Sequence, residues 1–413
     1  MYWLGIVTGS RTVCRNLSVR GGFATVAKAT KVARAGCTVD PVTKALTPSI
    51  VMSSTFEREK DLSYDGEFIY GRMGNPTRSL LEKTLAELEG GDEACSFGSG
   101  LAGIHALISA LGQGGHVVLG EDMYHGTRSL IHGVFSRWGL EHSVVDLSSE
   151  EELSACLERA SRPGTGPVVL ISEIPSNPML NVPDMRRLSD LCRAHGALHA
   201  VDSTWMSPVL CSPFEFGADM VLHSTTKYMG GHSDMTGGAV ILGPDCNETA
   251  GSIFEQCKTV QQLGGAVPSP FDCWLLLRGL RSLQARMKLH CENANYVAQF
   301  LSEHPAVSKV HFPGNPDHPQ HEIMKSQMNI PDCYGGMMSI EIHGGMEKAV
   351  AVAAKTKLFA RATSLGGTES LIEHRASIEP EDTPTPDSLL RLSIGLEDKR
   401  DLVDDLSNAL GKR

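Results

Sequence analysis

The chain has 413 residues, more than a single hydrophobic core usually organises, and this length predicts two domains. Its 48 acidic and 37 basic side chains give a net charge of −11, which argues against nucleic-acid binding as the main task, and no apolar run reaches the roughly 18 residues of a membrane span. The 11 cysteines form no Cys-x-x-Cys pair, which fits neither a zinc site nor a secreted disulfide framework and indicates a reducing compartment.

The first 39 residues contain no Asp or Glu but carry basic residues among serines, threonines and small apolar side chains. The basic residues are Arg11, Arg15, Arg20, Lys28, Lys31 and Arg34. This composition is typical of an organellar transit segment, but a disordered basic arm on a cytosolic enzyme would look the same. We expect residues 1–34 to be one of the two. A transit segment would be cleaved between Arg20 and Ala35 and would place the protein in the mitochondrion; an arm would leave it in the cytoplasm.

Beyond this segment, short apolar runs alternate with helical patterns, which is typical of an α/β domain with a mostly parallel, covered sheet. The predicted strands are 116–119, 143–146, 167–172, 197–202, 219–223 and 239–242. Between the third and fourth, Asp184 is predicted to cap a helix whose inner face holds Leu188, Leu191 and Cys192 and which ends before Gly196.

A glycine-rich turn, Ser-Phe-Gly-Ser-Gly-Leu-Ala-Gly-Ile at 96–104, opens an apolar helix pattern. Glycines at a helix start let the backbone approach an anion, and the free N–H groups bind phosphate there with the help of the helix dipole. The turn lacks the Lys-Ser/Thr pair of a nucleotide P-loop, and no suitably spaced acidic residue supports a dinucleotide site. It predicts an anion site of another kind.

The strand pattern 197–202 ends in a carboxylate, Asp202, followed by two hydroxyls. A carboxylate close to a pyridine nitrogen keeps that nitrogen protonated, because an opposite charge raises its pKa by about 1 to 3 units. Taken alone, such an aspartate would more often cap a helix or bind a metal. Lys227 follows at the end of a later predicted strand, so the two side chains could face one cleft at the carboxyl ends of the sheet.

Lys227 lies in the run His-Ser-Thr-Thr-Lys-Tyr-Met-Gly-Gly-His-Ser-Asp at 223–234. Desolvation lowers the pKa of an ammonium group from roughly 10.4 and frees the nucleophilic amine. Such lysines form Schiff bases with carbonyls, including the aldehyde of pyridoxal phosphate. His223, His232 and Asp234 look like a metal cluster, but we interpret them as hydrogen-bonded scaffold around the lysine and expect no metal.

The alternation of strand and helix patterns ends near Pro-Ser-Pro at 268–270. A long helix containing Trp274, Leu280 and Leu283 is predicted to follow and to lead into a smaller C-terminal domain. The stretch 379–386, with three prolines and three acidic residues, indicates an exposed loop just before a strand that carries Arg391.

These elements, in this order, resemble the fold-type I pyridoxal-phosphate enzymes of sulfur amino-acid metabolism: cystathionine γ-lyase, γ-synthase and β-lyase, methionine γ-lyase and the homoserine sulfhydrylases. The resemblance runs from about residue 35 to the C-terminus. Its linked motifs are Tyr70-Gly71-Arg72, Gly74-Asn75-Pro76-Thr77-Arg78, Ser99-Gly100-Leu101, Tyr124-His125-Gly126-Thr127, Glu173 with Pro175-Ser176-Asn177-Pro178, Val201-Asp202, Ser224-Thr225-Thr226-Lys227, Ser364-Leu365-Gly366-Gly367 with Glu369-Ser370-Leu371, and Arg391-Leu392-Ser393.

The resemblance implies an aspartate aminotransferase-like α/β fold, with an arm at 35–75, a cofactor-binding domain at 76–267 and a C-terminal α/β domain at 268–413. It implies Lys227 and Tyr124 as catalytic residues, the first forming the Schiff base and moving protons, the second stacking on the cofactor ring. The implied cofactor-binding residues are Lys227, Asp202, Tyr124, Gly100, Leu101, Ser224 and Thr226, with Tyr70 and Arg72 from a neighbouring subunit. Arg391 would bind the substrate α-carboxylate, a role suited to its planar fork of donors, assisted by Asn177 and Ser364. The active unit would then be a homodimer or homotetramer.

The residues expected around the distal end of the substrate depart from the family pattern. Thr363 occupies a position that is Glu in cystathionine γ-lyases and γ-synthases, so a carboxylate for the distal ammonium group of cystathionine is missing. Gly126 stands where methionine γ-lyases carry a cysteine, which argues against that activity. His125 replaces the usual glycine and could contact substrate or simply pack, and Ser129 replaces an arginine of some γ-lyases.

We therefore expect a transsulfuration enzyme that acts at Cγ of cystathionine or a related amino acid, as a γ-lyase or γ-synthase does. The main alternative is a cystathionine β-lyase. An aminotransferase and a catalytically silent scaffold of the same fold are further alternatives, although a silent scaffold would be expected to lose at least one of the motif residues.

Overall fold

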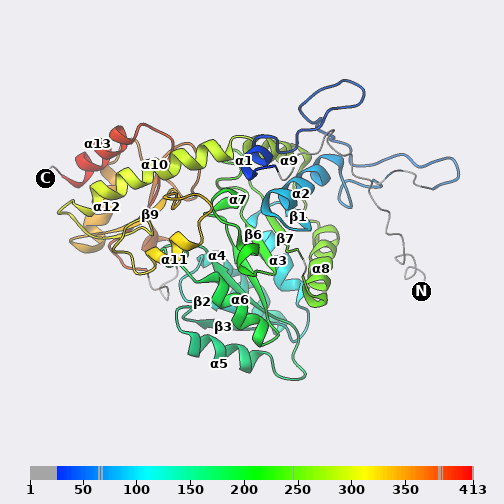
Figure 1. The fold of residues 1–413 in the computed structure, drawn as a ribbon, viewed down its shortest axis with the longest axis horizontal. Coiled ribbons are helices and arrows are strands. Elements are labelled where there is room, and N and C mark those ends of the chain that lie inside the picture. The colour runs from blue at the N-terminus through cyan, green and yellow to red at the C-terminus, as the bar shows by residue number, and fades with distance from the viewer. Residues whose placement is uncertain are drawn as a thin grey trace.

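The computed structural model describes residues 26–411, except 64, 65, 67, 245, 380–382 and 384. Two sheets organise the described residues: a seven-stranded sheet in the lower part of the view and a five-stranded sheet on the left (Figure 1). The long helix α10, Leu283–Ser302, runs along the top of the view towards the second sheet. Residues 1–25 of the predicted transit segment or arm lie outside the described part.

The seven-stranded sheet has the strand order β1-β7-β6-β5-β4-β2-β3. Its strands are β1 Glu93–Phe97, β2 His116–Gly120, β3 Glu141–Val145, β4 Val168–Glu173, β5 Leu198–Asp202, β6 Met220–His223 and β7 Gly238–Leu242. Strands β3, β2, β4, β5 and β6 are parallel to their neighbours among themselves, whereas β7 is antiparallel to both β6 and β1. The six predicted strands and the mostly parallel sheet are confirmed; the short β1 was not predicted.

Alternate residues of the central strands enter different hydrophobic cores, which explains their continuous apolar sequences. In β4, Val169 and Ile171 belong to the core beneath α3 (Gly100–Ala110) and α8 (Glu248–Gly264). Val168 and Leu170 instead pack with α5 (Glu150–Ala160) and α6 (Met185–Ala194). Helices thus cover both faces of the sheet, and its strand ends are the places where polar side chains gather.

The helix predicted after Asp184 is confirmed as α6. Asp184 accepts the backbone N–H of Arg187 at the first turn, as a helix cap does. Leu188 and Cys192 are buried on its inner face, and Gly196 follows its end with a φ of +68°.

The long helix predicted after residue 270 is instead two helices, α9 (Pro270–Leu280) and α10. The chain turns at Arg281 and Ser282, because α9 ends against the lysine turn: a Cβ on Gly279 would lie 2.4 Å from the carbonyl oxygen of Gly230. The Gly279 carbonyl then accepts the Ser282 N–H and a guanidinium N–H of Arg286. Local apolar spacing could not reveal a contact so distant in sequence.

The C-terminal domain is built on the five-stranded sheet, in the order β10-β11-β12-β9-β8. The strands are β8 Val307–His311, β9 Met337–Ile342, β10 Ala360–Arg361, β11 Leu371–His374 and β12 Leu389–Ser393. The helices of this part are α11 His321–Ser326, α12 Gly345–Lys355 and α13 Lys399–Leu410. Arg391 lies on β12, as predicted.

The end of the predicted transit segment or arm is part of the folded body, which corrects that prediction for residues 28–34. Helix α1 (Lys28–Ala33) buries Val32 completely, and Lys28 Nζ donates to Ser212 Oγ at 2.6 Å. A cleavage that spares this packing would fall before Lys28. The exact domain limits remain a prediction.

The described residues of the segment 36–71 form an extended arm at the upper right of the view (Figure 1). Its described residues include a single strand-like bridge, between Thr55 and Tyr70. Several large apolar side chains of the arm are exposed, among them Val42 at 86% and Met52 at 66%. Such a segment leaves apolar surface that its own chain does not cover.

Among the described residues, no helix has both the length and the apolar character needed to cross a membrane.

Candidate active site

A cavity of about 270 Å³ opens at the carboxyl ends of β4, β5 and β6, the edge of an open α/β sheet at which ligands bind. Ten of the twelve residues predicted for the site line it. These are Gly100, Leu101, Tyr124, Asn177, Asp202, Ser224, Thr226, Lys227, Ser364 and Arg391. Tyr70 and Arg72 do not line it: Tyr70 is 47% exposed on the arm, and Arg72 donates to the backbone carbonyl of Gln262 on α8.

Lys227 follows β6 in a tight turn, and its amine faces the C-terminal domain. Nζ donates to the hydroxyl of Ser364 at 2.7 Å. Burial, followed by the positive charge of Arg391, lowers the pKa of Lys227 to about 8. Desolvation was predicted to lower this pKa, and the structure gives the same direction.

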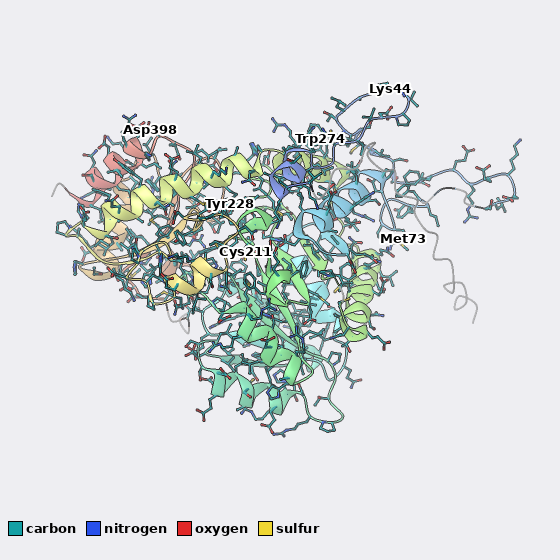
Figure 2. The ribbon with its side chains drawn as sticks, viewed as in Figure 1. Lys44, Met73, Cys211, Tyr228, Trp274 and Asp398 are labelled. Atoms are coloured by element: carbon teal, nitrogen blue, oxygen red, sulfur yellow. The ribbon has the colours of Figure 1, made fainter. Side chains whose placement is uncertain are left out.

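The lysine turn is bound by side chains of α10. Arg286 on α10 donates to the carbonyl oxygen of Tyr228 at 2.6 Å. Tyr228 is fully buried next to His290, with 5.0 Å between ring centroids. Figure 2 shows Tyr228 near the middle of the molecule, close to α10, which carries His290. The position of the lysine backbone is therefore fixed by packing between the two domains.

Both histidines near the lysine make hydrogen bonds within the protein. His223 Nε2 lies 3.0 Å from Glu89 Oε2, a buried pair beneath the sheet edge. His232 Nδ1 lies 2.8 Å from the carbonyl oxygen of Gly230. Within the part of the chain that the structure describes, no three His, Cys, Asp or Glu side chains are grouped as metal ligands would be.

Two carboxyl groups lie side by side at the ends of β4 and β5. Glu173 and Asp202 are paired in the register of these strands, and both line the cavity. Asp202 accepts the N–H of Thr204 at 2.9 Å, while burial raises its pKa. Burial and the neighbouring Asp202 raise the pKa of Glu173 further above its usual range.

The sequence motifs include Glu173 but predict no role for it. In the structure, Glu173 positions the backbone of other site residues. Its Oε1 accepts the backbone N–H of Tyr124 at 2.8 Å, and its Oε2 accepts the backbone N–H of Asn177 at 3.1 Å. One carboxyl group thus fixes the main chain at two predicted site residues. Sequence could not show this, because the three positions meet only when β4 is placed beside the chain after β2.

The start of α3 forms a narrow anion cradle. Ser99 caps the helix by accepting the N–H of Ala102 at 3.2 Å, so the earlier N–H groups of Gly100 and Leu101 have no acceptor within the helix. A Cβ on Gly100 would lie 2.8 Å from the Cβ of Ser224, and one on Gly238 would lie 2.2 Å from the carbonyl oxygen of Ser99. Only glycines allow this approach.

Tyr124 lies just before α4 (His125–Gly133) and beside the cavity. Its ring lies over Gly126, where an added Cβ would be 2.3 Å from the ring atom Cε1. A cysteine at 126 would therefore require a different placement of the tyrosine. His125 does not line the cavity: its Nδ1 lies 3.1 Å from Nη2 of Arg375.

Arg391 is buried on β12 and is held on several sides. Nη1 donates to Asn177 Oδ1 at 3.0 Å, and Nη2 donates to the Ser364 carbonyl at 3.1 Å and to Glu373 at 2.7 Å. The predicted trio of Arg391, Asn177 and Ser364 is thus brought together. Glu373, and the buried Arg375 that also lines the cavity, were missed.

Comparison with known proteins agrees with the interpretation of this cavity as the active site of a pyridoxal-phosphate enzyme. The family model described as Cys/Met metabolism PLP-dependent enzyme matches residues 29–411. The chain belongs to this family. Pyridoxal phosphate is accordingly its cofactor, and the predicted family, fold class and enzyme class are confirmed.

Relatives from this family share most of the chain. Cystathionine gamma-synthase of Mycobacterium tuberculosis is 43% identical over 389 residues, covering 93% of this chain and 96% of the relative. Cystathionine beta-lyase of Lactococcus lactis subsp. cremoris is 42% identical, covering 93% and 98%. The crystal structure of cystathionine gamma synthase from Xanthomonas oryzae pv. oryzae in complex with cystathionine superposes with a TM-score of 0.85 at 38% identity, covering 94% of this chain and 98% of that one.

The residues of the cavity fit the family's cofactor. The free N–H groups at Gly100 and Leu101 would bind a phosphate, and the Lys227 amine would form a Schiff base with an aldehyde. The carboxyl of Asp202 would pair with a basic ring nitrogen. Tyr124 is the aromatic group available to cover the ring. These individual roles remain predictions, now with a consistent geometry.

The lowered pKa of Lys227 predicts how fast the apoprotein takes up its cofactor. The amine is charged below about pH 8 and neutral above it, and only the neutral amine attacks an aldehyde. Mixing apoprotein with pyridoxal phosphate should give a rate of formation of the yellow species that rises about tenfold per pH unit well below pH 8 and levels above it. A midpoint near 10.5, the ordinary value for lysine, would contradict this assignment.

The close contact at Gly238 predicts a selective effect on cofactor affinity. Gly238→Ala should push the Ser99 carbonyl and the start of α3 out of place and weaken pyridoxal phosphate binding at least about tenfold, the size of one lost charge-assisted hydrogen bond. Equilibrium dialysis measures this. Gly103→Ala is the matched control, because its Cβ would meet only ordinary contacts from 3.4 Å and alanine favours the helix. Equal losses in both variants would count against a phosphate cradle at this turn.

Proposed function

We propose that this enzyme acts at Cγ of an amino-acid substrate in transsulfuration, and that its main reaction is γ-replacement, as in a cystathionine γ-synthase. The observation that carries this proposal is the charge of the cavity lining. Among the described residues that line it, the carboxylates are Glu173 and Asp202, both engaged at the strand ends. Thr363 and Arg375 also line it, and neither attracts an ammonium group.

A γ-lyase or β-lyase must hold cystathionine, whose distal end carries an ammonium group. Among the lining residues that the structure describes, no carboxylate is left for that group, and the nearby carboxylates of Glu373 and Glu379 are already paired with guanidinium groups. An activated homoserine has no distal ammonium and needs no such partner. The first substrate of a γ-replacement, the activated homoserine, therefore suits the cavity better than cystathionine does.

The residues of the chain supply binding and proton transfer. Arg391, oriented by Asn177, binds the α-carboxylate and fixes Cα near the amine of Lys227. The neutral amine removes the Cα proton and can return it further along the substrate chain, and Ser364 holds the amine between these steps. Bound pyridoxal phosphate supplies the electron sink that makes these protons acidic. The burial of Arg391 keeps water from competing for its donors.

Product analysis tests the choice of reaction. With O-acylhomoserine and cysteine, the enzyme should form cystathionine at least about tenfold faster than it degrades cystathionine, because the elimination that opens the first reaction acts on a substrate without a distal ammonium group, whereas degradation must begin by binding one. Lys227→Ala should abolish both reactions while the far-UV circular dichroism stays unchanged. Release of 2-oxobutyrate and cysteine from cystathionine as the main activity would make it a γ-lyase, and release of pyruvate and homocysteine a β-lyase. A fully active alanine variant would remove the assignment of Lys227.

We also propose that the active unit is at least a homodimer and that residues 1–27 direct the protein to the mitochondrion. Tyr70 and Arg72 do not line their own cavity, and the arm that carries them exposes apolar side chains that a second copy would cover. The location is supported by the acid-free, basic composition of the N-terminal residues.

Subunit complementation tests the shared site. Lys227→Ala and a Tyr70→Ala/Arg72→Ala double variant should each be inactive as homo-oligomers. After unfolding and refolding together, half of the dimers are mixed and each has one intact site, so activity should return to about a quarter of the wild-type value. Separately refolded samples mixed afterwards serve as the control. If the co-refolded mixture stays inactive, the two residues do not act across an interface.

A further inference from the structure

Four side chains of alternating charge form a chain behind the cavity, which we name the ion chain: Arg391, Glu373, Arg375 and Glu379. Their side chains are exposed by 4, 10, 1 and 3%, respectively. Glu373 Oε2 accepts from Arg391 Nη2 at 2.7 Å and from Arg375 Nη1 at 2.9 Å. Glu379 Oε1 accepts from Arg375 Nε at 2.9 Å and from Nη2 at 2.5 Å.

The carboxylate of Glu373 is a difficulty for a carboxylate-binding arginine. Glu373 and Arg391 are direct partners in the antiparallel register of β11 and β12, so their side chains cannot avoid each other. A carboxylate hydrogen-bonded to Nη2 occupies a donor that a substrate carboxylate would use, and it repels that substrate through a poorly solvated space. Arg391 paired with Glu373 alone would be a neutral pair.

Arg375 changes this balance by sharing the same oxygen of Glu373. It is itself anchored: Glu379 holds two of its donors, Thr385 donates to the other oxygen of Glu379, and His125 Nδ1 lies 3.1 Å from Arg375 Nη2. Burial and then Arg375 lower the pKa of His125, so the ring accepts this hydrogen bond as a neutral group. Arg375 therefore has no freedom to turn away from Glu373.

We propose that Arg375 is a positioning residue for substrate recognition: by sharing the Glu373 oxygen that Arg391 also contacts, it weakens the hold of Glu373 on Arg391, so that the guanidinium of Arg391 can bind an α-carboxylate. The proposal rests on the proposed role of Arg391. It explains why a second arginine, with no room to reach along the substrate, is buried at the cavity wall. Burial and then Arg375 lower the pKa of Arg391 to about 10, so Arg391 stays charged at neutral pH.

The test compares two ligands that differ only in their carboxyl group, L-alanine and L-alaninamide. Binding of each to the loaded enzyme is measured from the shift of its visible absorption band and, independently, by calorimetry. Arg375→Met should raise the Kd of alanine by about ten- to a hundredfold, the effect of one charge-assisted hydrogen bond, and leave that of alaninamide unchanged. An unchanged Kd for alanine, or equal weakening of both ligands, would overturn the proposal.

A rescue variant separates this role from simple packing. In Arg375→Met/Glu373→Gln the competing charge is gone, so the Kd of alanine should return to within about threefold of the wild-type value. A double variant as weak as the single one would show that Arg375 acts by packing alone. Glu373→Gln by itself should bind alanine more tightly, and this variant keeps the proposal testable if Arg375→Met does not fold.

Glu379→Gln is the matched control within the ion chain. It removes a buried charge next to Arg375 but leaves Arg375 free to pair more fully with Glu373, so alanine should bind as tightly as before or more tightly. If Glu379→Gln weakens alanine as much as Arg375→Met does, general disruption of the cluster is the cause and the proposal fails.

Arg391→Met distinguishes this proposal from the function on which it rests. Loss of the preference for alanine over alaninamide in Arg391→Met, with the preference intact in Arg375→Met, overturns only the role of Arg375. A preference that survives Arg391→Met overturns the carboxylate site and the role of Arg375 together.

Discussion

The environment of one amine, that of Lys227, is the constraint on which the rest of the site depends. An amine that is to act near neutral pH must be desolvated. Desolvation requires surrounding residues that stay in place and exclude water. The structure supplies these residues from both domains: Ser364 receives the amine, and Arg286 binds the backbone just beyond it. Arg286 is a buried cation whose partners are the Ser282 hydroxyl and main-chain carbonyls, among them that of Gly279 at 2.9 Å. It satisfies the turn without placing a carboxylate near the amine, which would raise the pKa of Lys227 again.

The same closure fixes the distance between the reactive amine and the carboxylate receptor. Asn177 comes from the larger domain and Arg391 from the smaller one, and their hydrogen bond crosses the boundary between the domains. Ser339 on β9 adds a second link by donating to the carbonyl of Pro178 at 2.7 Å. Because both links lie within the chain segment that also meets Glu173, a shift of one domain would move the substrate relative to Lys227.

The sequence could predict a site residue wherever a reactive side chain directly follows a predicted strand. Asp202 and Lys227 follow short apolar runs directly, so parallel pairing alone brings them to one edge. The ion chain could not be predicted in this way, because Glu373 meets Arg391 only through an antiparallel register that the sequence does not specify. Glu379 begins a stretch of prolines and acids that indicated an exposed loop, yet its side chain is 3% exposed, since the buried guanidinium of Arg375, four residues earlier, provides the partner. The described residues Thr383, Thr385 and Pro386 of that stretch are half-buried, and 380–382 and 384 lie outside the described residues.

Glu173 and Asp202, the two adjacent carboxyls at the strand ends, could each bind a cationic ring nitrogen in the cavity. Their hydrogen bonds decide between them. Glu173 and Asp202 are neighbours in register, and burial alone would raise the pKa of both. Glu173, however, spends one oxygen on the N–H of Tyr124 and the other on that of Asn177, so it cannot turn towards a ligand without releasing two predicted site residues. Asp202 is held by Thr204 and is partly buried at the cavity wall. A cationic ring nitrogen in the cavity would therefore pair with Asp202, and that pairing would in turn let the Asp202 carboxylate stay ionised beside its neighbour, since a positive charge close by offsets the cost of burying it.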